Sequence, residues 1–359
     1  PLRHSSAASD VYKRQVSDSR FERSVSKTGR SVTLITSKDI EPFLGGTLAD
    51  LLTNQVGIHI NGAQSHPGSE LSYFIRGGNN RQLLVIIDGV PVSDPTQIEN
   101  DFDLRTIDLS SIESVEIIRG AASSLYGSAA ATAVIKITTN QPKKQSLSGS
   151  IRTIFGTNND KWHFPIELDF QTRQLQFALG NATHAGLISL SDQRTMGMSS
   201  VIGAEEDSTV KQNLSAQYQL QISSDFRLNT IFTKDYFSSE YDDSFPALID
   251  ADNHFTSVSQ RVVVQPKWTG KSSSFVGRVS WSSSSRDFVS SFPMYFEGDA
   301  MDAEGVFSTK LSTNLTGLIG LNHKQQKAQF SDKVSTDLMD YFVNVLYESN
   351  GLLEAQAGA

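Results

Sequence analysis

The stretch Phe74–Thr139 constrains the fold of this chain more than any other, because apolar strands, Arg-Gly corners and an Asp-Gly turn follow one another there. It opens with Phe-Ile-Arg-Gly-Gly, and an apolar run then leads into Asp-Gly-Val-Pro-Val at Asp88. It closes with Val-Glu-Ile-Ile-Arg-Gly and with Val-Ile-Lys-Ile-Thr-Thr. An Asp-Gly pair between apolar runs predicts a β-hairpin, since a type I′ turn needs positive φ at both central residues. The stretch therefore predicts a small domain whose strands are joined by tight turns.

Two short helices are expected before this stretch. Thr36 is followed three residues later by Asp39, which is an N-cap signal for a helix near Ile40. Thr47–Leu52 carries leucines at helical spacing and predicts a second helix. Ile107–Ile112 is expected to be a short helical or turn segment. Strands are expected at 32–36, 57–61, 73–76, 83–87 and 114–118. Together these elements predict a compact α+β domain with a small mixed sheet.

Past Lys143 the pattern changes to an alternation of apolar and polar residues. Leu214, Ala216 and Tyr218 would face one way and the residues between them the other, as in a strand with one apolar face. Short turns alternate with polar runs, and we expect long loops at Ser238–Phe255 and Ser284–Glu304. Short connections at one end and long ones at the other are typical of outer-membrane β-barrels. A soluble β-sandwich also alternates, but polar runs of this length would be hard to bury.

Composition excludes several classes of protein. The chain of 359 residues has room for two or more domains. Its net charge of -8 argues against a nucleic-acid partner, because no basic excess is available to meet phosphates. The absence of cysteine excludes disulfides, thiolate nucleophiles and cysteine metal sites. No catalytic motif of a serine hydrolase, zinc protease or P-loop enzyme is present, so we do not expect an enzyme.

The ordered motifs carry a family resemblance. An Ile-Arg-Gly turn at Arg76, the hairpin at Asp88, Val-Glu-Ile-Ile-Arg-Gly ending at Gly120, Tyr126-Gly127 and a strand ending at Thr139 occur in this order. Each motif is common alone, but their joint order resembles the plug domain of TonB-dependent outer-membrane receptors. The resemblance implies an α+β plug domain followed by antiparallel transmembrane β-barrel strands. It also implies uptake of a scarce large solute across the bacterial outer membrane, driven by proton-motive force.

The same resemblance suggests how the chain is divided. Residues 1–15, which end in Asp-Val-Tyr-Lys-Arg-Gln, resemble a translated sequencing adapter, and we interpret them as a non-native leader. Residues 16–30 would be a lead-in after a missing TonB box, 31–142 the plug, and 145–359 the first part of the barrel. At about 20 residues per strand and connection, this last part supplies roughly ten strands. We therefore expect an incomplete barrel that forms an open sheet around the plug.

Two arginines are the candidate latch residues. The resemblance implies that Arg76 and Arg119 face acidic residues on the inner wall of the barrel and hold the plug there. A buried arginine is costly without a carboxylate partner, and the alternative is that both are solvated turn residues. Further motif residues are expected to have structural roles, the glycines because they permit backbone geometry that other residues avoid. They are Gly77, Asp88, Gly89, Glu116, Gly120, Tyr126 and Gly127.

Ligand contacts are expected in two regions. The resemblance implies that plug loops reach the solute, and the candidate residues are Gln64, Ser65, His66, Ser93, Asp94 and Thr96. Carboxylates that converge from one barrel loop suit Ca²⁺, and the candidates are Asp242, Asp243, Asp250 and Asp252. A solvated acidic loop is the alternative there. No other cofactor is expected.

The resemblance also names the expected partners. They are TonB with ExbB and ExbD, reached through an N-terminal box, and the lipid of the outer membrane. The cargo would be a ferric siderophore or cobalamin, and Arg20-Phe21-Glu22 and Tyr241-Asp242 resemble the cobalamin subgroup loosely. A non-transporting outer-membrane binding or adhesion protein is the alternative from another class.

Overall fold

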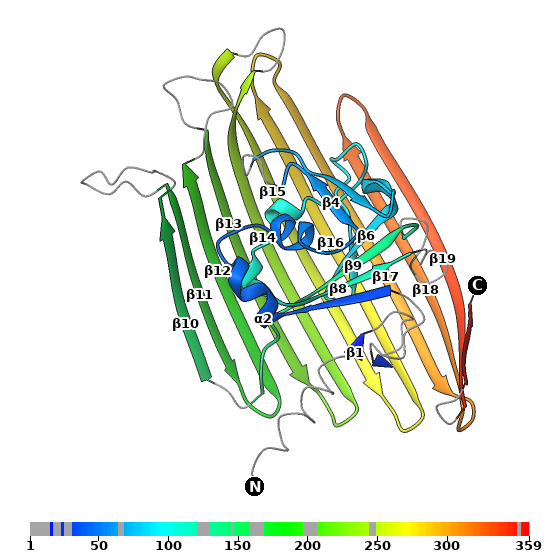
Figure 1. Ribbon diagram of the computed structural model, residues 1–359. Helices are drawn as coiled ribbons and strands as arrows, with labels where there is room; N and C mark the ends of the chain where they lie inside the picture. Colours follow the sequence, from blue (N-terminus) through cyan, green and yellow to red (C-terminus); the bar gives the residue numbers. More distant parts are fainter. Residues whose placement is uncertain are drawn as a thin grey trace.

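A computed structural model describes residues 15–16, 23–24, 31–63, 68–120, 126, 130–144, 147–157, 169–196, 207–243, 249–349 and 353–358. These residues form a small domain that lies against a large curved sheet (Figure 1). We call the unit from Ser31 to Thr139 the plug and the large sheet the wall. Two short strands, β1 (Gln15–Val16) and β2 (Arg23–Ser24), pair with each other before the plug.

The plug is built on a five-stranded mixed sheet of order β3-β8-β9-β6-β7, in which only β6 and β9 run parallel. Its strands are β3 (Ser31–Thr36), β6 (Leu83–Ile87), β7 (Val90–Val92), β8 (Ile112–Arg119) and β9 (Ala133–Thr139). A second sheet pairs β4 (Ile58–Asn61) with β5 (Ser72–Ile75). The predicted α+β class with a small mixed sheet is confirmed.

The helical segments of the plug are short. They are α2 (Ser37–Ile40), η2 (Glu41–Phe43), α3 (Leu48–Thr53), η3 (Asn80–Gln82), η4 (Leu104–Thr106) and η5 (Leu109–Ser111). The predicted helix near Ile40 is confirmed, and its N-cap Thr36 forms a capping box with Asp39. The second predicted helix is α3, where Thr47 accepts a hydrogen bond from the backbone N–H of Asp50.

The core of the plug fills both faces of its sheet. Val115 and Ile117 of β8 are fully buried on the face that α3 covers. Ile118 points to the opposite face, where it packs with Val134 and Leu84. All five residues of β6 are buried, as expected for a strand covered on both sides. The β6–β7 hairpin ends in the predicted turn, where Asp88 (φ 52°) and Gly89 (φ 81°) both have positive φ.

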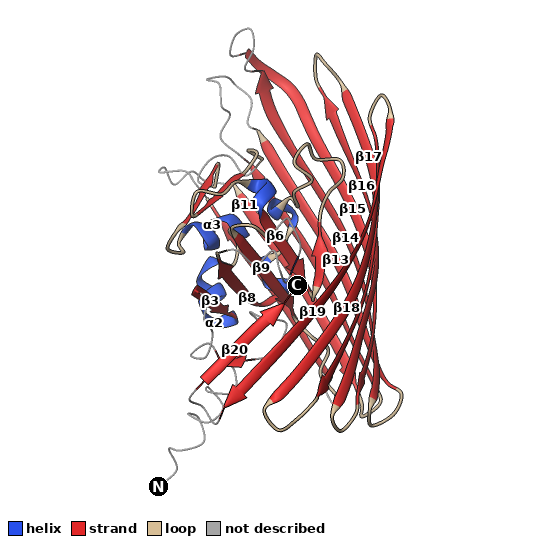
Figure 2. Ribbon diagram, turned by 90° about the vertical axis from the view of Figure 1, so that its right-hand side faces the viewer, coloured by secondary structure: helices blue, strands red, loops and turns tan. Residues whose placement is uncertain are grey.

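The wall is an 11-stranded antiparallel sheet in which each strand pairs with the next one in the sequence. Its strands are β10 (Leu147–Gly156), β11 (Phe170–Gly180), β12 (His184–Met196), β13 (Ser208–Gln221), β14 (Phe226–Asp243), β15 (Ile249–Thr269), β16 (Ser273–Val289), β17 (Met294–Lys310), β18 (Leu315–Gln329), β19 (Lys333–Ser349) and β20 (Leu353–Gly358). Within the described residues β10 and β20 do not pair, so the sheet is open, with the plug on its concave side (Figure 2). The expectation of an incomplete barrel of roughly ten strands agrees with this sheet.

The two long loops that we expected in the wall are mostly strand. β14 continues to Asp243 and β15 begins at Ile249, while β16 continues to Val289 and β17 begins at Met294. The prediction failed because a polar run can be a strand wherever neighbouring strands satisfy its backbone. The polarity of a segment indicates the surroundings of its side chains. Here it does not mark where the backbone hydrogen bonds between neighbouring strands end.

The two faces of the wall differ in polarity. On β12, Ser189 and Ser191 are buried toward the plug, while Ile188 and Leu190 point outward and are exposed. β11 repeats the pattern, with Gln174 buried and Leu175 exposed. The wall is thus polar inside and apolar outside. No helix of the described residues is long and apolar enough to cross a membrane.

We predict that the plug core depends on Ile117. Ile117→Ala removes a fully buried side chain and should lower the free energy of unfolding by about 2–5 kcal/mol. Val56→Ala changes a side chain that is 91% exposed. This substitution should alter the free energy of unfolding by no more than about 0.5 kcal/mol. Urea unfolding of the detergent-solubilised protein measures both. Equal values for the two variants would show that this core assignment is wrong.

Candidate functional site

The candidate site is the interface between the plug and the wall. Wall side chains reach across it to backbone carbonyls of the plug. Asn213 Nδ2 donates to the carbonyl of Thr106 at 2.6 Å, and Lys211 Nζ donates to that of Ile107 at 3.2 Å. These carbonyls follow the short helix η4, so they lack partners within a regular element. Most of the wall donors are neutral amides, and water can replace a neutral hydrogen bond at modest cost.

Asp88 connects the hairpin turn to the end of β9 and to the wall. Its carboxylate accepts hydrogen bonds from the N–H of Thr139 at 2.9 Å and from Thr139 Oγ1 at 2.8 Å. Its carbonyl accepts one from Gln265 Nε2 of the wall at 2.6 Å. Removal from water raises the pKa of Asp88, although the bonds from Thr139 oppose the rise. These contacts are those of a turn-capping residue, which is the structural role expected for Asp88.

Arg105 makes the most extensive charged contact at the interface. Its Nε lies 2.9 Å from Asp103 Oδ1, its Nη2 lies 2.7 Å from Asp103 Oδ2, and Nη1 donates to the carbonyl of Gly68. The guanidinium stacks on two wall rings, 5.0 Å from the centroid of Phe237 and 5.6 Å from that of Phe255. Burial acts to raise the pKa of Asp103, but Arg105 outweighs it and holds this pKa below its usual value.

The two rings belong to a row of phenylalanines on the plug side of the wall. Phe237, Phe255, Phe288 and Phe296 stand on β14 to β17, and their successive centroids are 6.1, 4.7 and 6.0 Å apart. Arg286 of the wall stacks on two of them, 4.8 Å from the centroid of Phe255. A plug cation and a wall cation therefore share one aromatic row. Sequence reasoning missed this arrangement, because only the strand register brings the rings together.

The structure places the two candidate latch arginines near each other. Arg119 Nη1 donates to Thr33 Oγ1 at 2.7 Å, and burial together with the charge of Arg76 lowers the pKa of Arg119. No carboxylate of the described residues forms an ion pair with either arginine. Gly77 and Gly120, which follow them, have the positive φ expected of these corners. The latch role stays a prediction.

The other candidate plug residues are dispersed. Ser93 accepts hydrogen bonds from Lys324 and Gln326 of the wall. Asp94 and Thr96 are buried and bond to each other, and Asp94 also lines a cavity between the plug and the wall. Glu116 pairs with Lys136 at 3.2 Å, and Tyr126 packs beside Ile118. Gln64, Ser65, His66 and Gly127 lie outside the described residues.

The acidic residues proposed for calcium have protein partners. Asp242 Oδ1 accepts a hydrogen bond from the N–H of Ala251, and Asp243 Oδ1 accepts one from Asn253 Nδ2. The side chain of Asp250 lies outside the described part of the chain, and Asp252 is exposed. Within the described ranges, no three acidic or histidine side chains are arranged to hold a metal ion. The calcium site stays a prediction.

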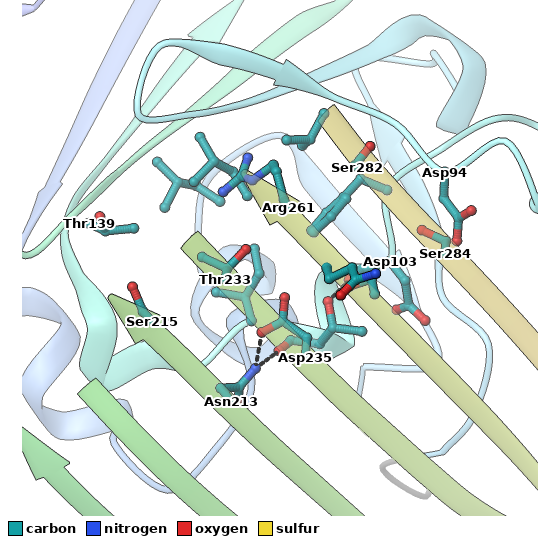
Figure 3. A pocket seen from close by; sticks show the side chains of 18 of the residues that line it. Asp94, Asp103, Thr139, Asn213, Ser215, Thr233, Asp235, Arg261, Ser282 and Ser284 are labelled. Atoms are coloured by element: carbon teal, nitrogen blue, oxygen red, sulfur yellow. Dashed lines mark hydrogen bonds between the residues drawn. The ribbon is translucent and has the colours of Figure 1, made fainter. Parts of the chain in front are cut away.

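A cavity of about 100 Å³ lies between the plug and the wall (Figure 3). Asn213 and Asp235 face each other in it at 2.6 Å, and Arg261 reaches in from β15. The wall lines the rest with hydroxyl groups, among them Ser215, Thr233, Ser257, Ser259, Ser280, Ser282 and Ser284. Since one water needs about 10–15 Å³ of such space, the cavity has room for several. The plug adds apolar side chains to the lining, among them Ile87, Val92 and Phe102, so the cavity has both polar and apolar sides.

We predict that Arg105→Ala will cost about 3–5 kcal/mol of plug stability at neutral pH, because it leaves the buried Asp103 carboxylate unpaired. The pair stabilises the wild-type protein above the unfolded pKa of about 3.9, and this contribution is lost as the pH falls through the lower folded pKa. In the variant, unopposed burial raises the pKa of Asp103, so the deficit should shrink as the solution is acidified.

Thermal unfolding at several pH values measures this effect. Arg194→Ala breaks an exposed ion pair with Asp192 and should cost about 1 kcal/mol or less. A deficit for Arg105→Ala that does not vary with pH would contradict the assignment.

Comparison with protein families agrees with this architecture. Residues 24–134 match the TonB-dependent Receptor Plug Domain. The vitamin B12 transporter BtuB of Vibrio cholerae is 37% identical over 132 residues, which are 36% of this chain and 21% of the transporter. BtuB of Photobacterium profundum is 29% identical over 133 residues, which are 37% of this chain and 21% of that protein.

Solved structures share the fold over most of the chain. The siderophore receptor PirA of Pseudomonas aeruginosa superposes with a TM-score of 0.71 at 18% identity, covering 92% of this chain and 56% of the receptor. A variant of the ferric enterobactin receptor PfeA from the same organism, in complex with enterobactin, gives a TM-score of 0.74 at 14% identity, covering 92% and 58%.

These comparisons cover the two parts of the molecule differently. The family model matches residues 24–134, which lie mostly in the plug, whereas the structural matches cover about nine tenths of the chain and so include the wall. The chain spans about a fifth of the curated relatives in sequence, and more than half of the solved structures. Residues 24–134 are thus identified as a TonB-dependent receptor plug domain, and the chain as a whole shares the fold of siderophore receptors over the plug and the wall.

Proposed function

We propose that this chain is part of a receptor that takes up a scarce, large solute across the bacterial outer membrane, driven by proton-motive force through TonB. The observation that carries the proposal is the wall itself. Its outward face exposes apolar residues such as Ile188 and Leu190, which suits contact with lipid. Its inward face bonds a separately folded domain mainly through neutral groups and leaves space for water. A domain held in this way blocks a barrel and can still be displaced.

TonB, energised by ExbB and ExbD, would supply the displacing force from the periplasmic side through a segment before the plug. The force need not break many ion pairs. Gln176 and Gln265, for example, donate neutral hydrogen bonds to plug carbonyls, and each such bond contributes about 0.5–1.5 kcal/mol. We propose no catalytic activity, since the named relatives are transporters and receptors.

Cobalamin and a ferric siderophore are the two cargo candidates. The relatives with the more similar plug sequence are named vitamin B12 transporters, whereas the structural neighbours are named siderophore or ferric enterobactin receptors. Plug similarity favours cobalamin. The alternative function, binding or adhesion without transport, requires no displacement of the plug, and uptake therefore discriminates between the two.

We expect cells that express the full-length receptor to accumulate labelled cobalamin or labelled ferric enterobactin. Accumulation should stop when tonB is deleted or the proton-motive force is collapsed, while binding at the cell surface persists. Both cargoes should be tested in the same strain, with the strain lacking the receptor as control. Surface binding without any accumulation would support the adhesion alternative.

The latch proposal has its own test. Arg119→Glu in the full-length receptor should loosen the plug, because a negative charge would face the acidic wall residues that the family resemblance implies. Limited proteolysis should then cleave the plug faster, and uptake should fall. Arg119→Lys keeps the positive charge, so its rate of proteolysis and its uptake should lie between those of the wild type and those of Arg119→Glu. The latch role fails if the charge reversal leaves both proteolysis and uptake unchanged.

A further inference from the structure

Three cavities follow one another along a single seam between the β6–β7 hairpin and the wall. The outer cavity, of about 300 Å³, is lined by Leu83 at the start of β6 and by Asn100 in the loop between β7 and η4. The middle one is the cavity of Figure 3. The inner one, of about 760 Å³, lies where Arg227 and Lys267 approach the short turns of the wall. We call this line of cavities the seam.

Neighbouring cavities of the seam share lining residues. The outer and middle cavities share Val92, Ser93, Phe102 and Lys324, and the middle and inner cavities share Pro91 and Ile137. Only side chains and the hairpin itself therefore separate one cavity from the next. Another cavity between the plug and the wall, beside Gln193 and Lys211, has only about 20 Å³.

The turn of the hairpin closes the seam between the middle and inner cavities. Val90 packs into the wall against Ile231 and Val263. Gly89 lies so close to the wall that an added Cβ would be 2.9 Å from Arg278 Nε. Next to these contacts stands the neutral hydrogen bond from Gln265 to the carbonyl of Asp88. The turn of the hairpin is thus seated on the wall by a small apolar contact and a neutral bond, and Ser93, just past β7, is bonded by Lys324 and Gln326.

Several charged groups of the wall along the seam have partners within the wall, while Arg261 lies near both Asp88 of the hairpin turn and Asp235 of the wall. Arg278 forms an ion pair with Glu304, which stands directly opposite it on β17. Lys324 stands directly opposite Asp302 across β17 and β18. If the hairpin moves away, Arg278 and Lys324 keep these wall partners, and Arg261 loses Asp88 but keeps Asp235, so no buried charge of these three is left without an opposite charge.

The opposite side of the plug is held more firmly. The segment Thr106–Ser110 accepts hydrogen bonds from four wall residues on β11 and β13, namely Gln174, Gln176, Lys211 and Asn213. Arg105, just before it, stacks on Phe237 of β14. The segment Thr106–Ser110 is therefore bonded to one flank of the wall, and the middle cavity lies between this segment and the β6–β7 hairpin.

We propose that the solute passes along the seam, with the β6–β7 hairpin as the gate and the segment Thr106–Ser110 as the fixed side. The inference rests on the proposed uptake function. The seam suits a polar solute, because its wall side presents the serines of β15 and β16. The gate opens when the hairpin leaves its seat on Ile231 and Val263, which joins the three cavities into one passage.

The 359 residues contain no cysteine, so pairs of thiols introduced in the full-length receptor meet no other thiol from this part of it. Val90→Cys with Val263→Cys places two thiols at the seat of the gate, and both changes replace one small apolar side chain by another. Ser110→Cys with Gln176→Cys places two thiols across the fixed side. Each pair is bridged in cells by the same short, reducible bifunctional thiol reagent.

Uptake and surface binding of labelled cobalamin and ferric enterobactin are then compared. The bridged gate pair should lose uptake by about tenfold or more while surface binding is retained, and reduction of the bridge should restore uptake. The receptor whose fixed-side pair is bridged should take up the solute as fast as the same variant does after reduction of the bridge. Surface binding by the reduced pairs shows that both variants fold.

Two results would overturn the proposed passage along the seam. In the first, uptake survives bridging of the gate pair. In the second, uptake is lost when either pair is bridged. The second result would mean that the whole plug must leave the wall. If the unmodified receptor takes up neither solute although it binds at the cell surface, the proposed function fails, and the seam fails with it.

Discussion

The structure depends on the reversed polarity of its large sheet. Because Ser189, Ser191 and Gln174 face inward while Ile188 and Leu190 face outward, the wall can contact an apolar environment and still bind a hydrophilic domain. An apolar inner face would leave the carbonyls of Thr106, Ile107 and Asp88 without partners, and a buried unpaired carbonyl is costly. The inner face supplies those partners from its own side chains.

Two kinds of contact hold the plug, and they have different consequences. Neutral amides and hydroxyls hold most of the interface, so individual contacts are weak and replaceable by water. Asp103 and Arg105 form a buried ion pair on an aromatic row, which is expensive to break from one side. Their distribution is uneven, because the ion pair and the bonded segment after it contact β11, β13, β14 and β15, whereas the outer and inner cavities lie beside the β6–β7 hairpin. This asymmetry is the physical basis for a plug that opens on one side.

Local sequence signals predicted the plug well where a single turn or cap decides the geometry. Asp88-Gly89 predicted a hairpin because few residues adopt positive φ, and Thr36 with Asp39 predicted a helix start because the two side chains satisfy end groups within one turn. Wall strands were predictable from period-two alternation. The expected loops at Ser238–Phe255 and Ser284–Glu304 failed, since polarity could not show how far the ladder of backbone bonds continues.

The sequence by itself determined the plug domain with its α+β fold and the two-faced strands, because turn chemistry and side-chain alternation are local properties. Tertiary structure decided which groups meet across the interface. Arg105 and Phe237 are separated by more than a hundred residues, and Val90 and Val263 by still more, so no local spacing could pair them. The register of the antiparallel ladder aligned the phenylalanine row and placed Glu304 opposite Arg278. The bonds to the segment Thr106–Ser110 and the cavities beside the hairpin follow from that alignment, because a cavity exists only where packed surfaces fail to fill the space between them.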